Sequence, residues 1–442
     1  MDKELTLHNR NQQVVRAIEA NNAELDADAR SRKFTAMAES PYRFFRGTSH
    51  LFWQDMYNDW RFALFGGVAG TQTWIQGDAH VYNFGAFANH DGEVIYGLDD
   101  FDDAVVSDYQ YDLWRLAISL VLDTRENGQF KADHCRQAVV TLASRYLEVA
   151  SCYQEQDLDQ EVHFTAETAT KPLDGFLKKV ARKKGRQRML AKWTRFQKNG
   201  KRVFDAENPK LKRLSPQARK QFLAAFEDYR QTRGEGLEDD FTVKDVVRRI
   251  RAGTGSMGTP RYYVLVEGEG GDHENDLILD VKRQDGPALL QAMTAVEQDA
   301  YARAYPNEGV RHAKAFRALA EHPDRYLGWL EMDDGVYSVR ERSPFKDDFD
   351  TTGLSKKKHY FRMAAQWGEI LATEHKRASR SLNPDQPFLF EQTLAAMTQD
   401  RETEFAGLVT AIAVHYAECV ERDYHTFMDT LAPLAGPISA QD

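Results

Sequence analysis

Two short stretches, QGDAHVYN at residues 76–83 and LDDFDDA at residues 98–104, decide how this chain of 442 residues is interpreted. The second stretch places four aspartates within residues 99–103. Carboxylates this close repel one another and raise each other's pKa, and a divalent cation would relieve the repulsion. An EF-hand calcium loop is excluded, because its Asp-x-Asp-x-Asp-Gly pattern and terminal glutamate are absent.

These residue types are the ones that phosphoryl transfer requires. An acceptor hydroxyl must be oriented and its proton accepted, which suits Asp78 as the catalytic residue. A carboxamide oxygen and a second carboxylate can hold Mg²⁺ against phosphates, and Asn83 and Asp100 fit these roles. The alternative is that Asp78 and Asn83 only cap turns. His80 is interpreted as a structural histidine, because no HExxH motif or paired histidine indicates a transition metal.

Short strands are predicted on the N-terminal side of both acidic motifs. Residues 73–75 lead into the first motif, and residues 93–98 lead into the second. The sequence Asn-His-Asp-Gly at 89–92 has the chemistry of a hairpin turn. Both motifs should therefore lie at the loop ends of a small β unit, and the periodicity that follows, to about residue 250, is mainly helical.

A glycine-rich loop, GTGSMG at residues 253–258, precedes two strand-like runs at 261–267 and 277–282. In dinucleotide-binding folds such a loop opens a helix, whereas here a strand follows, as in the kinase loop that covers ATP phosphates. Glycines allow backbone N–H groups to approach phosphate oxygens closely. A purely structural hairpin loop is the alternative. The nucleotide-binding residues expected in this loop are Gly253, Gly255, Ser256 and Gly258.

Lys282 ends the second of these runs, where a kinase lysine would bind the α- and β-phosphates. Such a lysine needs a carboxylate to hold it in position. Glu297, in the next predicted helix, is the first candidate, and Glu308 is the second. Glu297 could also be an ordinary surface glutamate. In kinases the glycine loop and lysine precede the catalytic loop. The order is reversed here, which predicts a circularly permuted sequence.

A family resemblance rests on three segments: Gly77–Asn83, Asp100–Ala104 and Tyr111–Leu113. This series resembles the motifs of aminoglycoside phosphotransferases and choline kinases, within the protein-kinase-like superfamily. The resemblance implies Asp78 as the catalytic aspartate, with Asn83 and Asp100 as magnesium ligands. It also implies that Asp112 steadies the catalytic loop, whereas Gln76 stands where a histidine is usual.

A closer resemblance covers roughly residues 30–380. The Ser-Pro and Phe-Phe-Arg-Gly sequences within 40–47, the catalytic loop and the glycine loop look like those of a bacterial family of unknown function. Arg46, in the first of these segments, could reach a substrate or phosphate, or serve in packing or a surface ion pair.

The sequence WGEILATEH at residues 367–375 resembles a helix that, in this superfamily, immediately precedes the catalytic loop. Joining residues near 380 to residues near 70 would restore the usual order. Such a permutation is tolerated when the original termini lie close together, as they often do in domains.

We therefore expect an α+β, two-lobed, circularly permuted protein-kinase-like fold that binds ATP and Mg²⁺ between its lobes. Residues 1–250 should hold an N-terminal extension, the acidic motifs and most of a helical large lobe. Residues 251–345 should form a small β-rich lobe that binds the nucleotide, and residues 346–442 should complete the large lobe. A chain of this length is long enough for two lobes.

The expected activity is transfer of the γ-phosphoryl group of ATP to a hydroxyl of a small molecule or protein. Nucleotidyl transfer of AMP to a protein is one alternative. A non-catalytic, nucleotide-binding regulatory module is another. The identity of the acceptor is not encoded in a readable pattern, because loops build the recognition surfaces of such folds.

Charge is distributed unevenly along the chain. The net charge is −10, yet residues 178–220 hold 17 Lys and Arg against two acids, Asp205 and Glu207. This segment is either a helical insert with a solvated face or a docking surface for an anionic partner. Only Trp193 and Phe196 supply aromatic rings in its densest part, so a nucleic-acid partner is not expected.

The composition is that of a globular protein without a membrane span. No apolar run approaches the roughly 18 residues that cross a bilayer. The polar N-terminal segment resembles neither a signal peptide nor a transit peptide. We therefore expect a cytoplasmic location.

Overall fold

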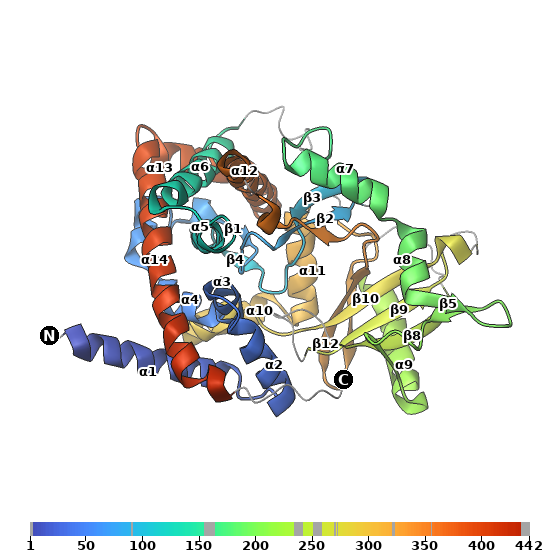
Figure 1. Cartoon of the computed structure of the whole chain (residues 1–442). Coiled ribbons are helices and arrows are strands. Elements are labelled where there is room, and N and C mark those ends of the chain that lie inside the picture. The colour runs from blue at the N-terminus through green and yellow to red at the C-terminus, as the bar shows by residue number, and fades with distance from the viewer. Residues whose placement is uncertain are drawn as a thin grey trace.

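The computed structural model describes residues 3–89, 92–153, 164–233, 242–250, 259–268, 271, 273–320, 323–354 and 356–434. Within these residues the chain has a mixed α+β fold in which helices surround several separate sheets (Figure 1). The helices are α1 (Lys3–Asn21), α2 (Ala27–Met37), α3 (Pro41–Gly47), α4 (Ser49–Met56), α5 (Gln110–Glu126), α6 (Ala132–Ala150), α7 (Leu173–Lys183), α8 (Arg186–Trp193), α9 (Pro216–Thr232), α10 (Ala295–Ala304), α11 (Glu308–Leu319), α12 (Lys357–Leu382), α13 (Leu389–Thr398) and α14 (Glu402–Thr430). The strands are β1 (Gln72–Ile75), β2 (Phe84–Ala88), β3 (Val94–Leu98), β4 (Val105–Asp108), β5 (Thr194–Phe196), β6 (Arg202–Phe204), β7 (Leu211–Arg213), β8 (Val243–Arg249), β9 (Arg261–Val266), β10 (Leu277–Gln284), β11 (Gly328–Met332), β12 (Gly335–Glu341) and β13 (Asp347–Asp348).

A six-stranded antiparallel sheet has the order β11-β12-β10-β9-β8-β7. Helix α9 covers one face of it with Phe222, Phe226 and Tyr229, which recur at helical spacing and pack against Val264 and Leu279. The predicted boundary at residue 251 is too late for this sheet, because β7 and β8 already belong to it.

The basic segment, predicted to be helical, is only partly so. It contains α8 and the start of α9, but the short strands β5, β6 and β7 lie between these helices. Strand β5 pairs with β6, and β7 joins the edge of the six-stranded sheet. The segment is therefore attached to the β-rich half of the molecule.

Two small sheets present the acidic motifs. Strand β1 pairs with β4, and β2 pairs with β3 and β13. The predicted turn chemistry at Asn89 is confirmed, because Glu93 N donates to Asn89 Oδ1 over 2.9 Å and Gly92 N donates to Asn89 O over 3.0 Å. Residues 76–83 therefore connect β1 to β2, and residues 99–104 connect β3 to β4.

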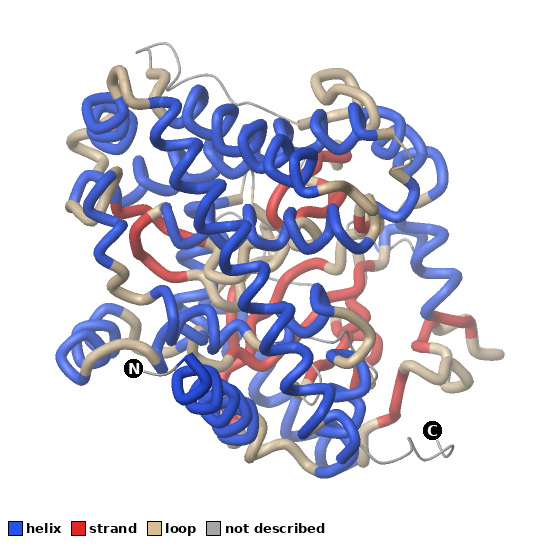
Figure 2. The backbone as a smooth tube through the Cα atoms, turned by 60° about the vertical axis from the view of Figure 1, so that its left-hand side comes forward, coloured by secondary structure: helices blue, strands red, loops and turns tan. Residues whose placement is uncertain are grey.

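The helical part is built around α5. Its side chains from Gln110 to Thr124 are all buried, as expected for a helix enclosed by other helices. The helices α6, α12 and α14 all contact α5, and Figure 2 shows most of the strands (red) lying among helices (blue). Gly368 lets α12 and α6 approach at backbone distance, because a Cβ there would collide with the carbonyl oxygen of Leu142.

Helix α12 holds the strands that precede both acidic motifs. Thr73 Oγ1, on β1, donates to the carbonyl oxygen of His375 over 2.8 Å. Leu98 N, at the end of β3, donates to Glu374 Oε1 over 3.0 Å. Adjacent residues near the C-terminus therefore fix the entry to two loops encoded some three hundred residues earlier.

In the ranges given above, none of the helices combines the length and the apolar character that crossing a bilayer needs.

We predict that Glu374→Gln changes how stability depends on pH. Burial raises the pKa of Glu374 from its ordinary value of 4.5 to about 8. A carboxyl group whose pKa is raised by folding costs stability as the pH rises from its unfolded pKa towards its folded pKa. Glutamine can still accept from Leu98 N, but it does not ionise. Denaturant unfolding should therefore show the variant more stable than wild type by a few kcal/mol at pH 8 and nearly equal at pH 4.5.

The control is Glu418→Gln, on the C-terminal helix α14. The side chain of Glu418 is exposed, so this substitution should leave the pH dependence of stability unchanged. If Glu374→Gln also followed the wild-type stability curve at every pH, ionisation of Glu374 would not contribute to the pH dependence of stability.

Candidate active site

The loop from Gln76 to Asn83 is held by a buried carboxylate at the start of α5. Asp112 accepts hydrogen bonds from Gln76 N (2.5 Å) and Gly77 N (2.9 Å). His375 Nε2 lies 3.2 Å from Asp112 Oδ2, and its Nδ1 lies 2.8 Å from the hydroxyl of Tyr146. Asp112 thus contacts the loop in the steadying manner that the resemblance implies.

Gln76 connects the two acidic loops. Its Oε1 accepts from Asp78 N over 2.9 Å, and its Nε2 donates to the carbonyl oxygen of Asp100 over 2.6 Å. Gly77 adds a second link, because its φ of +82° and the closeness of Asp103 O leave no room for a Cβ. A glutamine in place of the usual histidine therefore still supports the loop.

Three of the four aspartates of the second loop have separate partners outside the loop. Asp102 pairs with Lys282 and accepts from Gln284 Nε2 over 3.1 Å. Asp99 pairs with Lys346 over 2.8 Å, and Asp103 Oδ1 accepts from Ala288 N over 2.7 Å. The repulsion predicted from the sequence is therefore relieved in part by lysines from the C-terminal half.

The pKa values of these carboxyl groups are shifted in different directions by their surroundings. Burial would raise the pKa of Asp102, but Lys282 and His312 outweigh it, so the pKa is lowered. Burial and the neighbouring charge of Asp102 raise the pKa of Asp100. Burial, together with Asp78, raises the pKa of Asp103 to about 6. Asp100 is thus a carboxylate that a cation would stabilise.

Arg311 on α11 anchors the backbone of the aspartate loop. This fully buried guanidinium donates to the carbonyl oxygens of Ala104 and Asp102, each over 2.7 Å, and to that of Asp285 over 3.2 Å. Its Nε donates to Glu308 over 2.5 Å. The planar fork of arginine suits several fixed acceptors, and here it fixes the loop to the β-rich half.

The prediction that Glu297 or Glu308 holds Lys282 in position is wrong. Glu297 forms a capping box with Thr294 at the start of α10, and its Oε1 accepts from Tyr57 over 2.8 Å. Glu308 is engaged by Arg311 and Tyr301. The carboxylate beside Lys282 is Asp102. The sequence shows this aspartate within the acidic cluster but does not show that it pairs with Lys282. Burial opposes the charge of Lys282, yet Asp102 and Asp100 outweigh it and raise its pKa.

Asp78 has a cationic partner that sequence reasoning missed. Arg115 Nε donates to Asp78 Oδ1 over 2.6 Å, and its guanidinium lies 4.3 Å from the ring centre of Phe45. Burial raises the pKa of Asp78, while Arg115 partly offsets the effect. The available signal was an arginine within the otherwise apolar run that follows Asp112.

His80 has the structural role expected of it. Tyr82 N donates to His80 Nδ1 over 3.2 Å, and burial lowers the pKa of His80 well below its ordinary value. The neutral ring therefore supports the loop backbone, with Nε2 3.9 Å from Asp78 Oδ2.

The residues predicted to act together line one cavity of about 270 Å³. Asp78, Asn83, Asp100 and Lys282 all contribute to its walls. Asn83 Nδ2 donates to Asp78 O over 2.9 Å, and its Oδ1 has no hydrogen-bond partner among the described residues. The described part of the chain contains no group of three or more His, Cys, Asp or Glu arranged to hold a metal. Mg²⁺ often takes only one or two protein carboxylates and completes its shell with phosphates and water.

A neighbouring cavity, also about 270 Å³, shares Asp78, Asp102 and Lys282 with the first and extends towards α2 and α3. Arg46 lines both cavities, so this arginine reaches the site. Lys33 lines the second, and burial lowers its pKa to about 8. Neither Lys33 nor Arg46 has an ion-pair partner within the described ranges.

The glycine loop lies outside the described residues, so Gly253, Gly255, Ser256 and Gly258 are not placed. The flanking strands β8 and β9 are antiparallel neighbours, and the segment joins them. On its C-terminal side, Thr259 lines the second cavity and Arg261 lines the first.

We predict that Asp112→Asn loosens the loop, because one of the two backbone N–H groups would face an amide NH₂ instead of an acceptor. Leaving such a buried donor unpaired costs about 1–3 kcal/mol. Denaturant unfolding should show this loss, and the amides of Gln76 and Gly77 should exchange hydrogen faster. Asp133→Asn, on the exposed surface of α6, is the matched control. Equal stability and exchange in both variants would contradict the role of Asp112.

Comparison with protein families gives one match. A family model described as "Uncharacterized protein conserved in bacteria (DUF2252)" matches residues 25–430. Comparison with curated proteins and with solved structures finds no match. The matched range includes both acidic loops, Lys282 and α12.

Proposed function

The chain belongs to the DUF2252 family of uncharacterized bacterial proteins, and we propose that it is an ATP- and Mg²⁺-dependent phosphotransferase acting on a hydroxyl group. The observation that carries this proposal is the shared cavity. Asp78 and Asp100 come from loops near the N-terminus, and Lys282 comes from a strand some two hundred residues later. A cavity that combines a lysine with several carboxylates and a carboxamide suits a metal-bound triphosphate.

The arrangement of strands supports a small kinase-like lobe. Strands β8 and β9 flank the glycine-rich segment, and Lys282 lies on β10, the next strand in sequence and in the sheet. Kinases place their glycine loop before a lysine-bearing strand in the same way. Helix α11, which comes after β10 and α10 in the chain, contacts the sheet. The residue that it places near Asp102 is His312 rather than a glutamate.

The contacts of α12 support the proposed permutation. In the resemblance, a helix with the Leu-Ala-x-x-His pattern directly precedes the catalytic loop. Here His375 contacts β1 and Asp112, so the helix lies beside the strand that enters this loop. Proximity in space without continuity in sequence is what a cut between the two segments produces.

The residues have distinct proposed roles. Lys282 binds phosphate oxygens, which compete with Asp102 for its ammonium group. Asn83 and Asp100 hold Mg²⁺, which supplies positive charge against the phosphates. Asp78 orients the acceptor hydroxyl and takes its proton, while Arg115 fixes the direction of its carboxylate. The acceptor approaches from the cavity lined by Lys33 and Arg46.

The adenine base of the proposed ATP has a candidate position on the other side of its phosphates. A small cavity lined by Phe87, Phe316 and the connection after β12 shares Asp280, Arg340 and Lys346 with the Lys282 cavity. Aromatic side chains at this point suit a planar, largely apolar base. The nucleotide would then extend from this connection towards Asp78.

We predict that replacing two neighbouring aspartates by asparagine affects ATP binding differently. Asp100→Asn should weaken ATP binding in the presence of Mg²⁺ at least tenfold, because it removes a charged ligand of the metal. Asp102→Asn makes the same change two residues away, but it frees Lys282 and should maintain or strengthen binding. Isothermal titration calorimetry with ATP and Mg²⁺, repeated with EDTA, measures both. Equal affinities for wild type and Asp100→Asn would remove the metal assignment, and no binding by wild type would end the proposal.

The reaction is tested with ATP labelled at the α- or the γ-phosphate, incubated with a bacterial extract that supplies acceptors. We expect γ-label in an acceptor and at least a hundredfold loss in Asp78→Asn, because the acceptor proton then has no base. Transfer of α-label would favour nucleotidyl transfer to protein. Binding of ATP with no transfer of either label, and no effect of Asp78→Asn, would favour a regulatory module.

A further inference from the structure

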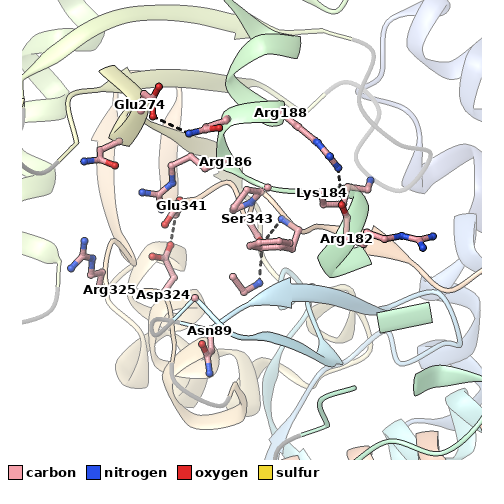
Figure 3. Close-up of a pocket in the computed structure, with 17 residues that line it drawn as sticks. Asn89, Arg182, Lys184, Arg186, Arg188, Glu274, Asp324, Arg325, Glu341 and Ser343 are labelled. Carbon is pink, nitrogen blue, oxygen red and sulfur yellow. Dashed lines mark hydrogen bonds and ion pairs between the residues drawn. The ribbon is translucent and has the colours of Figure 1, made fainter. Parts of the chain in front are cut away.

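A cavity of about 670 Å³ lies next to the small cavity proposed for the adenine base (Figure 3). It shares Ala88, Asp324, Glu341 and Ser343 with the small cavity proposed for the base. Its walls come from five places: the end of β2 with the turn after it, residues 182–188 where α7 leads into α8, residues 274–275 before β10, residues 324–325 before β11, and the end of β12 with the connection after it. The site is distinct from the Lys282 cavity, with which it has no lining residue in common.

Cationic side chains outnumber acidic ones in this cavity. The acidic lining residues are Glu274, Asp324 and Glu341. The cationic lining residues are Arg182, Lys184, Arg186, Arg188 and Arg325. In Figure 3, Arg325 lies on one side of the cavity, and Lys184 and Arg188 lie on the other. A ligand that spans them would need more than one anionic group.

The carboxylates already have partners. Glu341 pairs with Arg186 over 3.1 Å, and Glu274 accepts from Gln187 over 3.0 Å. Asp324 accepts from the backbone N–H groups of Tyr326 and Glu341. Burial and Asp324 raise the pKa of Glu341 to about 7, which reduces its negative charge near neutral pH. Two of the cations are paired as well, Arg186 with Glu341 and Lys184 with Asp347 over 3.4 Å, but the cationic lining residues still outnumber the acidic ones.

The start of α8 adds backbone donors to these side chains. Gly185 is the N-cap residue, and no side chain caps this end of the helix. The first helical bond is from Met189 N to Gly185 O, so the N–H groups of residues 186–188 have no acceptor within the helix. All three of these residues line the cavity. Free amides beside arginine side chains favour phosphate groups.

We propose that this cavity binds a small polyanion, a metabolite that carries at least two phosphate groups. The volume lies in the range of about 300–1,000 Å³ typical of small-molecule sites, which favours a metabolite over a macromolecule. The ligand would contact the six-stranded sheet, the basic segment and the turn after β2 together. The proposal does not depend on the phosphotransferase activity, since it concerns binding at a separate site.

The test is calorimetric titration of the full chain with tripolyphosphate, without Mg²⁺ and at 150 mM salt, which screens weak surface binding. We expect saturable binding by wild type. The double variant Lys184→Ala/Arg188→Ala should weaken it at least tenfold, although both side chains are at the surface and their loss should leave the fold intact. Lys198→Ala/Lys201→Ala removes the same charge from the same basic segment, outside the cavity, and should bind as wild type does.

Lys282→Ala separates this site from the proposed nucleotide site. Binding at the new site should persist in this variant. The proposal would be overturned by absence of binding to wild type, by equal weakening in the two double variants, or by loss of binding only in Lys282→Ala. The last result would show that tripolyphosphate occupies the Lys282 cavity instead.

Discussion

The need for countercharge around the aspartate loop is the constraint on which the rest of the structure depends. Four carboxylates at residues 99–103 cannot remain buried and ionised without cations nearby. Lys282 pairs with Asp102, Lys346 pairs with Asp99, and Arg311 binds the loop backbone. All three cations belong to the C-terminal half of the chain. Satisfying the loop therefore brings the six-stranded sheet and α11 against the small β unit, and the cavity lies where they meet.

On the other side of the site, a buried carboxylate is also satisfied by partners from distant segments, but through hydrogen bonds rather than ion pairs. Asp112 accepts from two backbone N–H groups of the loop at residues 76–83, while His375 contacts Asp112 and β1. Glu374 holds the end of the strand that leads into the aspartate loop. One turn of α12 thus fixes both loops. The permuted kinase-like arrangement that we propose would explain why this helix is distant in sequence, and the proposed chemistry rests on the residues that the two supports bring together.

The basic segment is neither a plain solvated helix nor a continuous docking face. Several of its cations are paired with acids elsewhere, among them Arg186 with Glu341 and Arg202 with Asp276. These pairs attach the segment to the six-stranded sheet. Other cations of the segment, Arg182, Lys184 and Arg188, gather around the start of α8, where they line a cavity. Whether a charged segment can bind a ligand therefore depends on where folding places its charges.

The sequence by itself determined many of the local elements, and it indicated four residues, Asp78, Asn83, Asp100 and Lys282, that line one cavity. Turn chemistry at Asn89, helical periodicity in α5 and the spacing of Asp78, Asn83 and Asp100 depend on near neighbours, which a sequence displays. Only the tertiary structure decided the partners. Lys282 pairs with Asp102 rather than Glu297, and Asp78 with Arg115, because a capping box satisfies Glu297 locally and packing brings the other groups together. Ion pairs between distant segments depend on three-dimensional distance, which sequence spacing does not contain.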